Sequence, residues 1–290
     1  PWTADHYLHC RHWCKSIVTS SILFTNAQLI DGSIVDVATD HGTIAWIGPT
    51  GSSPVVSNQK VNLNGYVLSS SFVEPHAHLD KAFLADRISN PAGDLMGAIR
   101  GLEQVRGTIT HEDLVERATR AVHLMSQNGV TSIRTHADTT ISGGLSSVQA
   151  LLEVKKNCAH FMDIQVAMLL EWPVTGAEGK ERQALARDAI SVGVDVIGGC
   201  PHLDPDPRGA VEYLLSLAID AQLPLDLHAD ENLRSDSSDL EHLADVVIRD
   251  GVTHQMNASH CVSLSTRSEN DIDRIAAKVA TAGITVTALP

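Results

Sequence analysis

The chain has 290 residues, of which 43% are apolar, and its formal net charge is −14. This length and apolar content are sufficient for a large hydrophobic core, and the negative charge argues against nucleic acid or an anionic membrane as a partner. No apolar run is long enough to span a bilayer. Five scattered cysteines are typical of a reduced, cytoplasmic setting.

Residues 1–19 form a leader that we expect to be disordered. They lack the order of basic, apolar and small-residue segments that a signal peptide has. Residues 20–70 contain short stretches of β-branched residues, separated by Gly, Asn and Pro. This pattern predicts a small β-domain, present only in part.

From residue 71 to residue 290, short apolar stretches alternate with amphipathic stretches of helical length. In the helical stretch 110–129, Thr110 is a suitable N-terminal capping residue. In the stretch 270–283, Asn270 can cap the start of the helix and Gly283 can end it. Repeated strand–helix units predict an α/β fold with a parallel sheet covered by helices. With no Gly-rich dinucleotide turn, they favour a (β/α)8 TIM barrel. The predicted strands are SFVEPHAH, SIRTHAD, DIQVAMLLE, DVIGGCPH, PLDLHADE, QMNASHC and ITVTALP.

Nearly every predicted strand ends on His, Asp or Glu, where a TIM barrel carries its chemistry. His76 and His78 are two residues apart, so on a strand they face the same side and can hold one metal ion. His228 is the best candidate for a third ligand. If its strand ends near Ala229, the chain can turn and bring Glu231 over the metal. His260 ends the next strand.

These stretches, in this order, resemble the cytosine deaminase branch of the amidohydrolase superfamily. The resemblance implies hydrolytic deamination of an amino-substituted nitrogen heterocycle, pyrimidine-like or triazine-like, with one divalent metal ion, iron or zinc. It implies that His76, His78 and His228 are metal ligands. It makes Glu231 the proton shuttle and His260 the residue that orients the attacking water.

The substrate side of the resemblance rests on the stretch 163–171. Glu171 stands where cytosine deaminases carry a glutamine that pairs with the ring. An ionised carboxylate only accepts hydrogen bonds, so Glu171 favours an N–H-rich or cationic substrate edge rather than cytosine. His136, Asp138 and His202 end neighbouring strands and are expected to line the pocket. We expect Lys81 to point outward as a salt-bridge partner, and assign it no chemistry.

The sequence ends in the seventh predicted strand, so we expect an incomplete barrel whose eighth strand, with the family's aspartate ligand, is missing. On that basis we expect weak or no activity, and favour a fragment of a longer enzyme over a degenerate, non-catalytic chain. A cyclic-amide hydrolase is a further alternative, although the stretch 195–202 lacks the lysine that such enzymes use. The expected partners are a small heterocycle and water, and a homo-oligomer is compatible with the sequence.

Overall fold

The computed structural model describes residues 21–64 and 66–289, so the expectations for residues 1–19 lie outside the described residues. The chain divides into two units, one ending at Ser71 and one beginning at Phe72.

The first unit contains a four-stranded sheet with the order β3-β2-β1-β4. β2 pairs antiparallel with both β1 and β3, and β4 joins β1 in parallel. The buried carboxylate of Asp36 accepts hydrogen bonds from the amides of Asn26 and Gly51, both at 2.9 Å, and so stabilises the irregular part of β1 and the turn after β3. The predicted small β-rich unit is confirmed. Its strands are β1 (Ile22–Gln28), β2 (Ile34–Asp40), β3 (Thr43–Pro49) and β4 (Gln59–Asn62).

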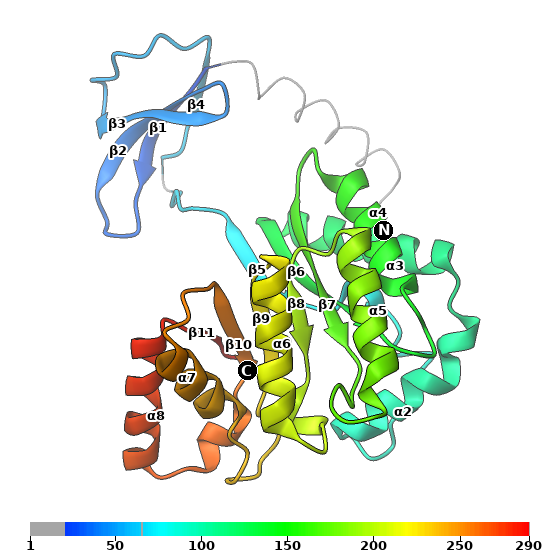
Figure 1. Ribbon diagram of the computed structural model, residues 1–290. Helices are drawn as coiled ribbons and strands as arrows, with labels where there is room; N and C mark the ends of the chain where they lie inside the picture. The colour runs from blue at the N-terminus through cyan, green and yellow to red at the C-terminus, as the bar shows by residue number, and fades with distance from the viewer. Residues whose placement is uncertain (1–20, 65, 290) are drawn as a thin grey trace. The chain divides into compact units, whose positions relative to one another are not determined.

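The second unit is built on a seven-stranded sheet in which every neighbouring pair is parallel. Its order, β11-β10-β9-β8-β7-β6-β5, follows the sequence, and the curved sheet is nearly closed (Figure 1). Each strand falls within a predicted stretch or extends it, which confirms the prediction of an incomplete TIM barrel. The strands are β5 (Phe72–Ala77), β6 (Val130–Thr139), β7 (Asp163–Leu170), β8 (Ile197–Gly199), β9 (Leu225–Ala229), β10 (Met256–His260) and β11 (Thr285–Thr287).

Helices cover the outer face of this sheet (Figure 1). The Thr110 side chain accepts a hydrogen bond from the Asp113 amide at the start of α3, as predicted. The predicted cap at Asn270 is wrong: Ser268, in extended backbone, caps α8, and Asn270 lies inside the first turn. The helices are α2 (Leu95–Val105), α3 (His111–Gln127), α4 (Ser146–Cys158), α5 (Gly179–Val192), α6 (Pro207–Ala221), α7 (Asp239–Asp250) and α8 (Glu269–Ala282).

β9 illustrates how the sequence separates the two faces of the sheet. All five of its residues are buried. Leu225, Leu227 and Ala229 belong to the hydrophobic core beneath the helices, and each buried leucine contributes about 2 kcal/mol. Asp226 and His228 alternate with them and therefore point into the barrel. The strand thus uses its apolar residues for packing and its polar residues for the interior.

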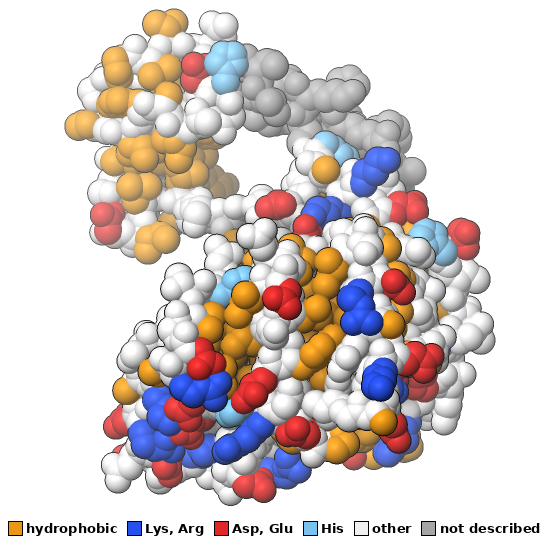
Figure 2. Space-filling view, viewed as in Figure 1, with side chains coloured by type: hydrophobic (Ala, Val, Ile, Leu, Met, Phe, Trp, Pro, Cys, Tyr) orange, Lys and Arg blue, Asp and Glu red, His pale blue; other side chains and the backbone are white. Residues whose placement is uncertain are grey.

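The outer surface of the second unit is strongly charged where α7 and α8 pack together. Figure 2 shows acidic and basic side chains intermixed over this pair, and Glu241 of α7 binds both Arg274 and Lys278 of α8. Within residues 21–64 and 66–289, no helix has the length and apolar character needed to cross a membrane.

Candidate metal centre and active site

The carboxyl ends of the parallel strands bring histidines from distant parts of the sequence to one end of the barrel. His76 is in β5 and His78 directly follows it. His136 comes from β6, His228 from β9, and His260 is the last residue of β10.

Four of these imidazoles form a compact group. The ring nitrogens of His76, His78, His136 and His228 include one atom from each that lies within 4.8 Å of the others. The Nε2 atoms of His78 and His228 are 3.3 Å apart, and the ring centroids of His76 and His136 are 4.2 Å apart. The ring of His260 lies beside the group, with its centroid 4.8 Å from that of His228. Convergent imidazole nitrogens are ligands that zinc and iron accept.

The chemistry of the group fits a divalent cation. Both ring nitrogens of His76 and of His136, and Nδ1 of His228, are buried without a hydrogen-bond partner among the described residues. Such an unpartnered buried atom costs about 1–3 kcal/mol. Burial lowers the pKa of His76 to about 3, and lowers the pKa of His228 well below 6.5. The rings of His76 and His228 are therefore neutral at pH 7 and present lone pairs, which is the form that binds metal.

A buried polar layer around Asp226 lies next to the histidine group, and it was not predicted from the sequence. Its other members are Arg134, Asn257 and Ser259. The Asp226 carboxylate accepts hydrogen bonds from Arg134 at 2.8 Å, Asn257 at 2.8 Å and Ser259 at 2.9 Å. Nε2 of His136 lies 3.7 Å from it, beyond hydrogen-bond distance. Burial pushes the pKa of Asp226 up, but the pull of His136 and Arg134 is larger and the net shift is downward. Asp226 lies two residues before His228, so the same alternation rule could have found it.

Glu231 reaches the site because β9 ends at Ala229, as the sequence analysis required. Asp230 adopts a left-handed conformation, with φ of 52°, and turns the chain. Oε2 of Glu231 then lies 3.7 Å from Nε2 of His260. Burial raises the pKa of Glu231 to about 7 and lowers that of His260 to about 4. A carboxyl group with this pKa can both take and release a proton near neutral pH.

The turn before Glu231 is held by Asp230, whose side chain is buried. Its carboxylate accepts hydrogen bonds from the Ser237 hydroxyl and from the amides of Asp239 and Leu240 at the start of α7. The Asp239 carboxylate accepts in return from the Asp230 amide at 3.2 Å. This reciprocal pair fixes the position of Glu231 relative to α7.

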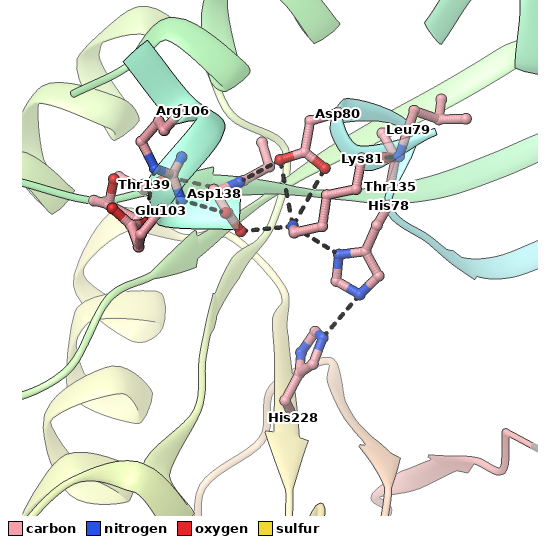
Figure 3. Close-up of polar contacts among 12 residues, drawn as sticks. His78, Leu79, Asp80, Lys81, Glu103, Arg106, Thr135, Asp138, Thr139 and His228 are labelled. Carbon is pink, nitrogen blue, oxygen red and sulfur yellow. Dashed lines mark hydrogen bonds and ion pairs between the residues drawn. The ribbon is translucent and has the colours of Figure 1, made fainter. Parts of the chain in front are cut away.

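Lys81 is a salt-bridge partner, as expected, but its side chain does not point outward, which corrects that part of the expectation. Figure 3 shows its side chain directed at Asp138 and at the ring of His78. Nζ lies 2.6 Å from Oδ1 of Asp138, 3.3 Å from Oδ1 of Asp80 and 3.3 Å from Nδ1 of His78. Burial disfavours the charged amine, but Asp138 and Asp80 outweigh it and raise the pKa of Lys81. The lysine is therefore a cation next to the histidine group.

The remaining predicted pocket residues have other partners in the structure. Oε2 of Glu171, just after β7, accepts hydrogen bonds from the Ile141 amide at 2.9 Å and from Arg182 at 3.2 Å. Nδ1 of His202 donates to the His228 carbonyl at 3.0 Å, so His202 supports the backbone of a histidine in the group. Asp138 binds Lys81 and, at 3.0 Å, Arg106. Their roles toward a substrate stay predictions.

A cavity of about 620 Å³ opens at the other end of the strands. It is lined by residues at or near the starts of β9, β10 and β11, among them Leu225, Met256 and Thr285, and by Arg134 of the polar layer. Because it lies toward the amino ends of the strands, it is separate from the histidine group.

Known proteins are similar to this chain in sequence and in fold. The sequence matches a pterin deaminase from Rhizobium rhizogenes with 28% identity over 258 residues, which are 88% of this chain and 58% of that protein. The fold matches the crystal structure of 5-methylcytosine deaminase from Klebsiella pneumoniae with a TM-score of 0.81 and 29% identity, over 92% of this chain and 64% of that one.

The N-isopropylammelide isopropylaminohydrolase of Burkholderia multivorans has the same fold, with a TM-score of 0.79, 24% identity, and coverage of 93% of this chain and 68% of that chain. The chain thus spans less than two thirds of the length of the pterin deaminase that it matches. The pattern of the Amidohydrolase family covers residues 102–290, well over half of the sequence. The chain belongs to the amidohydrolase family.

Proposed function

We propose that this chain carries a mononuclear metal centre, with iron or zinc held by His76, His78 and His228, and that it hydrolyses an amino-substituted nitrogen heterocycle. The observation that carries the proposal is the convergence of four imidazoles at one end of the barrel, with Glu231 next to the His260 ring that lies beside them. Such a cation lowers the pKa of water, so that hydroxide is available near neutral pH. His136 stands next to the proposed ligands in the same group.

Glu231 is the proposed proton carrier. Its pKa of about 7 lets it accept the proton of the attacking water and deliver it to a ring nitrogen of the substrate, which promotes loss of the amino group. His260, 3.7 Å from the Glu231 carboxylate, is placed to orient the water. Because burial keeps His260 neutral, its ring can accept or donate a hydrogen bond according to its tautomer.

The proposed substrate is a pyrimidine-, pterin- or triazine-like ring. This class is supported by the similar proteins, which are a pterin deaminase, a 5-methylcytosine deaminase and an N-isopropylammelide hydrolase. We propose that Glu171 contacts the ring. Its Oε2 atom is held by Ile141 and Arg182, which leaves Oε1 to accept from a substrate N–H.

The test is ammonia release by the full chain after chelation and reloading with Zn²⁺ or Fe²⁺, with metal content measured in parallel. The substrates tested are pterin, 5-methylcytosine and N-isopropylammelide. For N-isopropylammelide, the released product that is measured is isopropylamine instead of ammonia. Glu231→Gln should abolish product formation, and the exposed Glu116→Gln on α3 should not. A loaded chain that binds metal but releases no amine from any ring would contradict the proposal. Ring opening without amine release would indicate a cyclic-amide hydrolase.

A further inference from the structure

The contact between Lys81 and His78 sets the hydrogen-bonding state of the His78 ring. An ammonium group has three N–H donors and no acceptor. In the structure these face Asp138, Asp80 and Nδ1 of His78 (Figure 3). With Lys81 donating, Nδ1 of His78 must present its lone pair, so the proton of the neutral ring is on Nε2.

A cation on the proposed centre requires the opposite tautomer. Nε2 of His78 is the atom that faces the group, 3.3 Å from Nε2 of His228. To bind a metal ion, this Nε2 must present its lone pair, and the ring proton then moves to Nδ1. Nδ1–H and the Lys81 ammonium would then be two donors facing each other, with no acceptor between them.

The surroundings of Lys81 keep its ammonium group close to Nδ1 of His78. The two carboxylates hold Nζ, and Asp80 also accepts from the Asp138 amide at 3.0 Å. Arg117 of α3 donates to the carbonyls of Asp80 and Ala82 on either side of the lysine, at 3.0 and 2.6 Å. Neutralising Lys81 would leave the buried Asp80 without its cation and Asp138 with Arg106 alone, which is unfavourable.

We propose that Lys81 is a positioning residue of the metal centre, whose hydrogen bond to Nδ1 of His78 is mutually exclusive with a cation on Nε2. Metal binding displaces the ammonium from Nδ1, while Asp138 and Asp80 retain it. Lys81 therefore lowers the affinity of the centre for metal. The inference depends on the proposed metal centre, and goes beyond it by assigning a role to a residue that is not a ligand.

The first test is Zn²⁺ affinity, measured by competition with a chromophoric chelator. Lys81→Gln removes the charge and supplies an amide oxygen that accepts from Nδ1–H, whereas Lys81→Met removes the charge only. We expect affinity to increase in the order Lys, Met, Gln, with Gln about tenfold above wild type. Lys81→Arg keeps a charged donor and should match wild type. Circular dichroism of each variant checks that it is folded.

The second test reads the tautomer directly, by NMR of the chain with ¹⁵N-labelled histidine, with His78 assigned from a His78→Gln variant. After chelation, the Nδ1 atom of His78 should be unprotonated, and Zn²⁺ should reverse this. A protonated Nδ1 before Zn²⁺ addition overturns the inference, as does a Zn²⁺ affinity of the Gln and Met variants no higher than that of wild type. If neither the wild type nor any variant binds Zn²⁺, the proposal of a metal centre is wrong. If Zn²⁺ binds but removing the lysine charge does not raise the affinity, the metal centre stands and only the role proposed for Lys81 is wrong.

Discussion

Glu231→Gln should change how the stability of the protein depends on pH. Burial raises the pKa of Glu231 from its ordinary 4.5 to about 7, and its side chain is only 21% exposed. The folded chain therefore binds this proton more tightly than the unfolded chain does. The stability that this proton provides is complete below pH 4.5 and is lost as the pH rises through 7. The shift corresponds to about 3 kcal/mol.

The measurement is urea unfolding in the presence of a chelator at pH 4.5 and 7.5. It is followed by far-UV circular dichroism, because the described helices lie in the second unit. The free energy of unfolding of wild type minus that of Glu231→Gln should fall by about 3 kcal/mol between the two pH values. Asp239, whose pKa burial also raises to about 7, is present in both proteins and cancels. For the exposed Glu116→Gln the difference should stay constant. A constant difference for Glu231→Gln would refute the assignment of a buried, proton-binding carboxylate.

Three further outcomes can be checked. Asp226→Asn should destabilise the chain by about 3 kcal/mol in urea unfolding, because Arg134 is left without its ion-pair partner; the exposed Asp188→Asn should change stability by less than about 0.5 kcal/mol. Zn²⁺ affinity, measured by chelator competition, should be nearly constant from pH 7.5 to 5.5, since burial lowers the pKa of His76 to about 3; a fall of more than about tenfold would contradict this. Thr110→Ala should lower the thermal midpoint through a loss of about 1 kcal/mol at the start of α3, and Thr110→Ser should not.

The sequence was sufficient to predict the seven strands of the second unit because strand and helix impose different spacings on apolar residues. The same spacing places His76 and His78 on one face, and the end of β9 at Ala229 was a condition stated for Glu231. These features depend on local chain geometry, which the residue pattern records.

The features that the sequence did not predict depend on local turns and on barrel curvature. On a continued strand, Lys81 would face away from His78, three residues earlier. Instead η1 (Leu79–Lys81) follows β5, and residues three apart eclipse in such a turn. The Lys81 amide accordingly donates to the His78 carbonyl at 3.0 Å, and the two side chains meet. For His136, alternation gives the face, but the depth at which neighbouring strands place their side chains follows from the curvature of the sheet.

The hydrogen bonds of Asp230 connect the proposed proton carrier to the outside of the molecule. Because the Asp230 carboxylate accepts hydrogen bonds from the first amides of α7, the backbone just before Glu231 is attached to the start of that helix. Glu241 of α7 is in turn paired with Arg274 and Lys278 on the surface of α8. Substitutions in this ion-pair cluster therefore change the contacts of a helix whose start is hydrogen-bonded to the residue before Glu231, so the activity of such variants should be measured together with their stability.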